Sequence, residues 1–237
     1  MNTLENKVAY ITGGTKGIGF GIAMKLLEQG MKVAISGRSQ EAVRHAAGLL
    51  GTPETVLALV SEVSDPQQEA RAVQEILKKW GTLDVVIANA GVGIFASVDE
   101  LTLDSWNEMI DVNLSGVFYT LKASIEALKQ SKGYYFTIAS LAGTNFFARG
   151  AGYNASKFGV VGFTQAAMLD LRPYDIKVTT IMPGSVATHF NRNEPGDKDA
   201  WKIQPEDLGE LVVDLLKMPA RTLPSKVEVR PTRPDKK

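Results

Sequence analysis

The sequence predicts an α/β fold in which a doubly wound parallel sheet of about seven strands carries helices on both faces. Short runs of apolar and β-branched residues recur along the chain, and longer segments of helical period separate them. Near-continuous apolar runs are typical of strands that helices cover on both faces. The expected strands are residues 7–12, 32–36, 55–60, 84–88, 134–139, 176–181 and 226–229.

The helical segments between these strands have recognisable ends. The helix expected at 18–29 stops before Gly30, because glycine readily takes the left-handed conformation that ends a helix. The helix expected at 154–171 stops near Pro173, because proline cannot continue the hydrogen-bond pattern. Another long helix is expected across 104–129.

The whole chain, residues 1–237, is expected to form a single domain. A hydrophobic fraction of 44% over 237 residues is enough for one large core, and no linker, repeat or low-complexity segment divides it. The longest irregular stretch is about 184–204. Loops of that length in compact domains are usually lids or binding loops, so we expect a substrate loop there.

The composition excludes several kinds of site. Lys plus Arg is 26 and Asp plus Glu is 26, so the net charge of zero predicts neither a nucleic-acid partner nor an anionic membrane. The chain has no cysteine and only two histidines, His45 and His189, and we expect no metal site. It shows no targeting pattern and no apolar run of membrane-spanning length, which predicts a cytoplasmic location.

A glycine-rich turn lies between the first strand and the first helix. Residues 12–19 read Thr-Gly-Gly-Thr-Lys-Gly-Ile-Gly. Glycines let the backbone approach a pyrophosphate closely, and the helix N-terminus presents free N–H groups to it. A glycine cluster alone is as often an ordinary turn, but this position favours a dinucleotide site. The expected contacts are Gly13, Thr15, Lys16, Gly17, Ile18 and Gly19.

The end of the second strand indicates which dinucleotide is bound. An acidic residue there typically holds the ribose 2′-hydroxyl of NAD, whereas an arginine accommodates the 2′-phosphate of NADP. This strand ends Ser36-Gly37-Arg38-Ser39 and carries no acid. Arg38 and Lys16 together would neutralise a 2′-phosphate, with Ser39 beside them, so NADP(H) is the predicted cofactor. The alternative is two solvated surface cations.

Five further motifs follow the glycine turn in order. They are Ala88-Asn-Ala-Gly91, Asn113 within Val-Asn-Leu, Ser140 at the end of the fifth strand, Tyr153-Asn-Ala-Ser-Lys157, and Pro183-Gly-Ser-Val-Ala-Thr188. With the glycine turn, this set resembles the short-chain dehydrogenase/reductase family over nearly the whole chain. The resemblance implies a Rossmann-type NAD(P)-binding domain.

Tyr153 and Lys157 are the centre of the expected chemistry. A separation of four residues places them on one face of a helix. A phenol titrates near ~10, and a neighbouring ammonium group lowers that value toward the range needed for acid–base catalysis. The bare spacing also fits a half-buried tyrosine beside a surface lysine. Ser140 favours catalysis, because it lies at the carboxyl end of a strand, where open α/β sheets build their sites.

The resemblance assigns a role to each of these residues. Tyr153 exchanges a proton with the oxygen of a carbonyl or alcohol, and Ser140 hydrogen-bonds that oxygen. Lys157 lowers the tyrosine pKa and binds the nicotinamide ribose. Asn113 positions a water that relays protons to Lys157, the alternative being a kink residue within a helix. The implied reaction interconverts a carbonyl and a secondary alcohol by hydride transfer with NADPH.

The resemblance also implies further cofactor contacts. Asn89, Ala90 and Gly91 would line the adenine-ribose side. Glu62 stands where the family often has aspartate, so its contact with adenine stays open, while Val63 contributes its backbone. Thr188 would meet the nicotinamide carboxamide. It closes a segment that also supplies Pro183, Gly184 and Val186.

The substrate is predicted only as a small-molecule carbonyl or alcohol. Phe95, Leu141, Phe146, Phe147, His189, Phe190 and Trp201 are candidates for a partly aromatic pocket, and each is equally consistent with ordinary packing. The family includes 3-oxoacyl-carrier-protein reductases and sepiapterin reductases. The former usually end in an Asn-Gly-Gly strand, which this chain replaces with Val227-Glu-Val-Arg. Reductases of simple ketones or diketones stay open.

Two expectations concern partners and class. Small and apolar residues along 104–129 and 154–171, which the family commonly pairs between subunits, predict a homodimer or homotetramer. A non-catalytic NADP-sensing protein is the alternative from another class. The complete Ser–Tyr–Lys set argues against that alternative.

Overall fold

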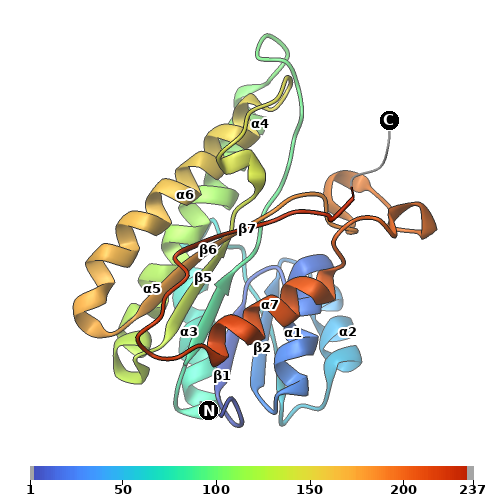
Figure 1. The fold of residues 1–237 in the computed structure, drawn as a ribbon. Helices are drawn as coiled ribbons and strands as arrows, with labels where there is room; N and C mark the ends of the chain where they lie inside the picture. The colour runs from blue at the N-terminus through green and yellow to red at the C-terminus, as the bar shows by residue number, and fades with distance from the viewer. Residues whose placement is uncertain (1–2, 234–237) are drawn as a thin grey trace.

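A parallel sheet forms the centre of the molecule, and its order confirms the predicted α/β fold. The computed structural model describes residues 3–233, the side chain of Arg192 excepted. The sheet has seven strands in the order β3-β2-β1-β4-β5-β6-β7, and neighbouring strands run parallel (Figure 1). The strands are β1 Val8–Ile11, β2 Lys32–Gly37, β3 Val56–Val60, β4 Val85–Ala88, β5 Tyr134–Ile138, β6 Lys177–Pro183 and β7 Lys226–Val229.

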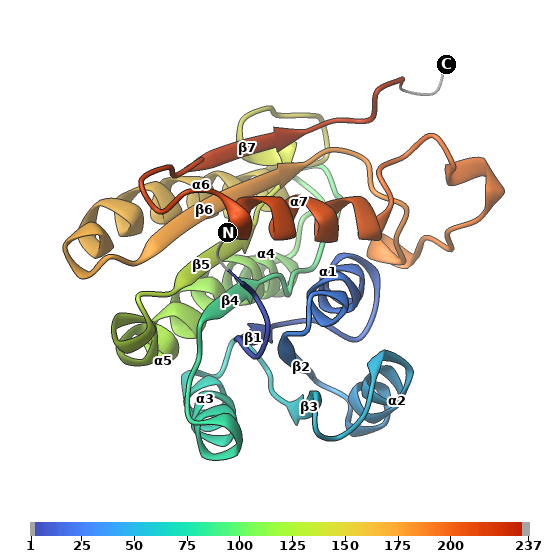
Figure 2. The same ribbon diagram turned by 60° about the horizontal axis from the view of Figure 1, so that its bottom comes forward.

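Helices cover both faces of the sheet, as Figures 1 and 2 show. One layer contains α1, α2 and α7, and the opposite layer contains α3, α5 and α6. The helices are α1 Gly17–Glu28, α2 Gln40–Leu50, α3 Pro66–Trp80, α4 Leu103–Ile110, α5 Gly116–Ser131, α6 Ala151–Leu171 and α7 Pro205–Lys217. Gly30 has φ +74°, the left-handed conformation expected at the end of the first helix.

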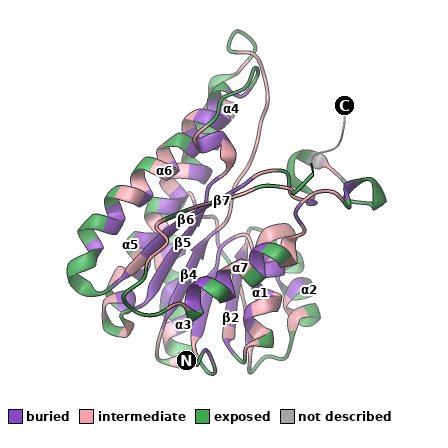
Figure 3. Cartoon of the chain, in the orientation of Figure 1, coloured by how far each residue is buried: buried purple, intermediate pink, exposed green. Residues whose placement is uncertain are grey.

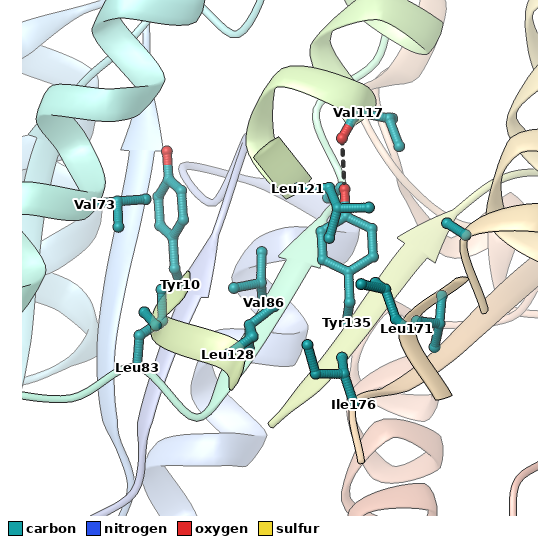
Figure 4. Packing of buried hydrophobic residues seen from close by; sticks show 14 of the residues in the cluster. Tyr10, Val73, Leu83, Val86, Val117, Leu121, Leu128, Tyr135, Leu171 and Ile176 are labelled. Atoms are coloured by element: carbon teal, nitrogen blue, oxygen red, sulfur yellow. Dashed lines mark hydrogen bonds between the residues drawn. The ribbon is translucent and has the colours of Figure 1, made fainter. Parts of the chain in front are cut away.

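The strands alternate their side chains between two cores. In β1, Tyr10 packs into the core beneath α3, α5 and α6, whereas Ile11 packs into the core beneath α1 and α7. Buried strands therefore lie between helices whose outer sides are exposed (Figure 3). Tyr10 and Tyr135 are among the largest fully buried side chains, and the Tyr135 hydroxyl donates to the Val117 carbonyl at 2.6 Å (Figure 4).

A buried carboxyl group joins several elements of one core. Glu69 of α3 is fully buried, and its carboxyl oxygens lie 3.0 Å from the Tyr10 hydroxyl, 2.7 Å from Ser61 Oγ and 2.8 Å from Thr120 Oγ1. Burial raises the pKa of Glu69, and these hydroxyl groups act in the opposite direction. The group connects β1, the segment after β3, α3 and α5.

Two expected elements differ from the structure. The helix expected across 104–129 is divided by a π-helical turn, Asp111–Ser115, between α4 and α5. The stretch 184–204 is more ordered than expected. It contains the 3₁₀ turns Phe190–Arg192 and Asp197–Asp199 and a parallel bridge between Val186 and Ile203.

Two features are absent from the described residues, 3–233. No helix there is long and apolar enough to cross a membrane. Within the same range, no three histidine, aspartate or glutamate side chains gather in a way that could hold a metal ion.

Candidate active site

A cavity of about 870 Å³ opens at the carboxyl ends of the strands. Its wall includes Gly13 after β1, Arg38 after β2, Asn89 after β4 and Ser140 after β5. In the sheet, β1 and β4 are neighbours, and the connections from them lead to opposite sides. Such switch points are where open α/β sheets bind ligands, and the volume lies within the range of small-molecule sites.

The glycine turn is held in place by the chain that leaves β4. Gly13 and Gly17 have φ values of +64° and +58°, a conformation that favours glycine. A Cβ atom on Gly13 would lie 2.9 Å from Ala90 Cα. The Asn89 amide donates to the carbonyls of Thr12 at 2.9 Å and Gly13 at 3.1 Å. The turn therefore lies directly against the segment after β4.

Most of the predicted cofactor residues line this one cavity. They are Gly13, Thr15, Lys16, Gly17, Ile18, Arg38, Glu62, Val63, Asn89, Ala90, Gly91, Tyr153, Lys157, Pro183, Gly184, Val186 and Thr188. Thr188 lies next to the glycine turn, since a Cβ atom on Gly17 would be 3.3 Å from its methyl carbon.

Gly19 and Ser39 are two predicted contacts that do not line the cavity. A Cβ atom on Gly19 would lie 2.6 Å from the Asn89 side-chain nitrogen, so this glycine serves the packing of α1 against the turn. The Ser39 hydroxyl accepts a hydrogen bond from the Ala42 amide at 3.3 Å and caps α2.

An acidic residue faces Arg38, which the sequence did not lead us to expect. The end of β2 has no acid, but β3 pairs with β2 and is followed by Glu62. The Glu62 Oε2 atom lies 3.7 Å from Arg38 Nε. The two side chains are 31% and 67% exposed, so this is a partly solvated ion pair.

Ser140, Tyr153 and Lys157 line the same cavity. Ser140 follows β5, and its hydroxyl accepts from the Ala142 amide at 3.1 Å, which caps the 3₁₀ turn Leu141–Gly143. Tyr153 lies in the first turn of α6 and Lys157 one turn later. The buried Lys157 amine donates to the Ile138 carbonyl at 2.9 Å and lies 5.8 Å from the centre of the Tyr153 ring.

Burial is the main cause of the pKa shifts of Tyr153 and Lys157. It raises the pKa of Tyr153, and the neighbouring Ser140 hydroxyl acts in the opposite direction. Burial lowers the pKa of Lys157 to about 8. Lowering of the tyrosine pKa by Lys157 stays a prediction, since the lysine amine is directed to the Ile138 carbonyl. The net shift of the Tyr153 pKa is upward. Near neutral pH Tyr153 is therefore a protonated phenol.

Asn113 lies behind the cavity wall, in the π-helical turn. Its side-chain oxygen accepts from the Val92 amide at 2.7 Å, and its nitrogen donates to the Val92 carbonyl at 2.9 Å and to Ser156 Oγ at 3.0 Å. Gly91 separates it from the cavity, where a Cβ atom would lie 3.2 Å from Asn113 Oδ1 and 3.6 Å from Lys157 Nζ. The side chain thus clamps the β4 loop to α6.

Aromatic rings surround Tyr153 at the other end of the cavity. Ring centroids of Phe95 and Phe190 lie 5.4 Å and 5.7 Å from that of Tyr153, and Phe147 lies 5.8 Å from Phe95. Phe190 also packs on Gly93, because a Cβ atom there would be 2.5 Å from its ring. Of these three phenylalanines, Phe190 lines the cavity, whereas Phe95 and Phe147 are not part of its wall.

The other pocket candidates are placed differently. His189 lines the main cavity, but Phe146 is 87% exposed and Leu141 lies beside Gly184. Trp201 lines a separate cavity of about 440 Å³ that is also bounded by Arg230. The sequence places these residues in the loops after β5 and β6. It does not predict whether each side chain faces the main cavity.

Several residues of the cavity wall were not predicted. Most stand next to predicted ones in the sequence, so the lengths of the motifs were underestimated. They are Gly37, Ser61, Val92, Gly93, Ile94, Glu108, Val112, Ile138, Ala139, Ser185, Asn191, Asn193 and Lys202. Glu108 lies far from any motif, and no sequence signal pointed to it. Lys202 was not named, but it lies within the predicted substrate loop 184–204, next to the candidate Trp201.

Comparison with known proteins establishes the family. The family model described as short chain dehydrogenase matches residues 7–199. Oxidoreductases of Staphylococcus aureus (strain MW2) and Staphylococcus saprophyticus are 33% identical over 233 residues and 32% identical over 238 residues. Each alignment covers 98% of this chain and 100% of the relative. The chain belongs to the short-chain dehydrogenase/reductase family of oxidoreductases, which confirms the resemblance found in the sequence.

Solved structures agree with this assignment. An alcohol dehydrogenase from Thermococcus sibiricus, complexed with 5-hydroxy-NADP, is 31% identical with a TM-score of 0.90, and the match covers 98% of this chain and 100% of that one. A 3-ketoacyl-(acyl-carrier-protein) reductase from Brucella melitensis, complexed with NADH, is 27% identical with a TM-score of 0.88, covering 97% and 99%. The neighbours support a nicotinamide cofactor for the family fold.

The buried Lys157 predicts a pH dependence of stability. Its pKa is about 8 in the folded chain and near ~10.4 in an unfolded one, so the unfolded chain binds more protons between these values. The free energy of unfolding therefore rises with pH in this window, by at most about 1.4 kcal/mol per unit. In Lys157→Met this contribution is absent. Urea unfolding of both proteins at pH 7, 8, 9 and 10 measures the difference.

Lys122→Met is the matched control, because Lys122 is an exposed lysine of α5. We expect its stability curve to run parallel to that of the wild type. If the Lys157→Met curve also ran parallel, the pKa assigned to Lys157 would be wrong.

Proposed function

We propose that this protein is an NADP(H)-dependent oxidoreductase that interconverts a carbonyl and a secondary alcohol, with Tyr153 as the general acid and base. The observation that carries the proposal is that Ser140, Tyr153 and Lys157 share one cavity with the glycine turn and Arg38. We further propose that residues 1–237 act as a single domain and that the loop 184–204 contacts the substrate.

The residues of the cavity fit a dinucleotide. Gly13 and Gly17 provide the close backbone approach that a pyrophosphate needs, and Lys16 and Arg38 supply positive charge for a 2′-phosphate. Thr188 and the segment from Pro183 lie beside the turn and would hold the nicotinamide end. When bound, the cofactor supplies the hydride that the amino acids cannot.

The protein side of the reaction is proton transfer and charge stabilisation. The raised pKa of Tyr153 keeps it protonated near neutral pH, the form that gives a proton to a carbonyl oxygen during reduction. Ser140 donates a hydrogen bond to that oxygen as negative charge develops. Below pH 8 the charged Lys157 stabilises the phenolate that remains after the transfer.

Asn113 acts in this scheme as a positioning residue. Its two bonds to Val92 and its bond to Ser156 fix the wall at Gly91, next to the Lys157 amine. The water relay to Lys157 implied by the family stays a prediction for this chain. It would depend on the backbone of the π-helical turn, since the side-chain amide is already hydrogen-bonded at both ends.

The rings around Tyr153 favour an apolar carbonyl compound of small size. Phe95 and Phe190 lie against the tyrosine, and neither carries a charge. A 3-oxoacyl thioester is the second candidate, favoured by the similarity to the Brucella melitensis reductase. The β7 sequence Lys-Val-Glu-Val lacks the Asn-Gly-Gly of those reductases and argues against it. The cytoplasmic location stays a prediction from the sequence.

Tyr153→Phe tests the catalytic assignment. We expect NADPH consumption to fall at least about 100-fold, because the variant lacks the proton that general acid catalysis requires. The panel of substrates comprises simple ketones, diketones and 3-oxoacyl thioesters. Tyr174→Phe removes an exposed hydroxyl and is the matched control. Cofactor binding by the inactive variant, measured by calorimetry, should be nearly unchanged. Full turnover in Tyr153→Phe would refute the role of Tyr153. A wild type that binds the cofactor but turns over no substrate of the panel would favour a sensing protein.

Arg38 predicts the choice between the two nicotinamide cofactors. At saturating substrate we expect a higher kcat/KM with NADPH than with NADH, because Arg38 and Lys16 neutralise the additional phosphate. Arg38→Asp should reverse the order. Arg44→Asp, on the exposed side of α2, has the same charge change away from the cavity and should retain the wild-type order. A wild-type preference for NADH would contradict the proposal.

We propose that the protein is a homodimer or homotetramer built on α5 and α6. Phe118, Phe158 and Leu169 are 46%, 44% and 56% exposed on these helices, an apolar surface that association would cover. Light scattering should give a mass of two or four times 25.6 kDa, and Phe118→Glu with Phe158→Glu should lower it. A wild-type mass of one chain would overturn the assembly.

A further inference from the structure

The site proposed for the 2′-phosphate contains an opposing charge. Glu62 Oε2 lies 3.7 Å from Arg38 Nε, and both residues line the cavity beside Ser61. Lys16 is exposed on the glycine turn and lines the same cavity. The adenine end thus places one carboxylate at its wall together with two cations.

The position of Glu62 is set by the start of α3. Its backbone amide donates to Gln68 Oε1 at 3.0 Å. The side-chain amide of Gln68 donates in turn to Asp65 Oδ2 at 2.9 Å. Asp65 in turn caps α3 through the amides of Gln67 and Gln68. The backbone of Glu62 is therefore anchored, and its side chain extends from a fixed point toward Arg38.

A second acid lies behind the cavity wall near Glu62. Glu69 lies behind Ser61, whose hydroxyl donates to it at 2.7 Å. Glu62 is among the groups that raise the pKa of Glu69, although burial and the hydroxyl groups have larger effects.

We propose that Glu62 is a specificity-determining residue that limits the preference of this protein for NADP over NAD. The inference rests on the proposed function. With NAD, the Glu62 carboxylate remains the partner of Arg38, so the arginine is not left unpaired beside a ribose hydroxyl. With NADP, the 2′-phosphate must compete with Glu62 for Arg38 and is repelled by it. The protein therefore accepts both cofactors, with a smaller preference than Arg38 alone would give.

Glu62→Gln tests this inference with little change in side-chain shape. The dissociation constants of NADP and NAD are measured by calorimetry at low salt, which makes binding the readout. Because the pair is partly exposed, we expect NADP to bind about three- to tenfold more tightly, with NAD unchanged or weaker. The effect should shrink in 1 M salt, where charges are screened.

Two further variants test whether the change in cofactor preference comes from the pair of Glu62 and Arg38. Glu41→Gln, exposed in the first turn of α2 and outside the cavity, makes the same change in net charge and should leave the ratio of the two constants as in the wild type. Glu62→Gln is also made in an Arg38→Met background. There the logarithm of the ratio of the NADP and NAD dissociation constants should change less than half as much as it does when Arg38 is present. That result would show that Glu62 acts largely through Arg38.

The outcomes separate the two proposals. If both cofactors bind and Glu62→Gln leaves the ratio unchanged, or Glu41→Gln shifts it equally, the inference about Glu62 is wrong while the proposed function stands. If the wild type binds neither cofactor, both are wrong. Thermal unfolding of each variant confirms that the comparison is between folded proteins.

Discussion

The site depends on the hydrogen bonds that join the chain after β1 to the chain after β4. Thr12 Oγ1 accepts from the amides of Asn89 at 3.0 Å and Ala90 at 3.1 Å, and the Asn89 side chain returns two hydrogen bonds to the turn. These bonds connect strands that are neighbours in the sheet but 77 residues apart in the chain. The conformation of the glycine turn and the position of Gly91 beside Lys157 both follow from them. The glycine turn and the cavity wall beside Lys157 are thereby held to a single backbone geometry.

At the end of the cavity that holds Tyr153 and Lys157, burial is the main cause of the pKa shifts of both side chains. Burial keeps the proton on Tyr153 and weakens the hold of Lys157 on its own, so Lys157 becomes the more acidic of the two groups. The end of the cavity proposed for adenine differs in its exposure to water, because Arg38 and Glu62 are partly solvated there. We therefore expect this pair to have only a modest effect on the relative binding of NADP and NAD.

The sequence predicted the parts of the molecule that follow from local pattern. The sheet, the end of α6 near Pro173 and the union of Ser140, Tyr153 and Lys157 all follow from periodicity and motif order, because backbone geometry alone places them. The pattern did not predict where side chains point. Ser39 caps a helix, Asn113 clamps a loop across a π-helical turn, and Glu62 reaches Arg38 from the neighbouring strand. Each depends on a contact between segments whose pairing the pattern does not specify.

The hydroxyl groups around Glu69 carry too few protons for a fully charged carboxylate. Thr120 Oγ1 has one hydrogen, yet it lies 2.8 Å from both Glu69 Oε2 and the Gly116 carbonyl. A proton on Glu69 resolves this, because the acid then donates to Thr120 and Thr120 donates to Gly116. Folding would then take up a proton from solution. Since the folded chain binds more protons than the unfolded one above pH 4.5, this contribution to stability is complete below that value and is lost as the pH rises through the raised pKa of Glu69.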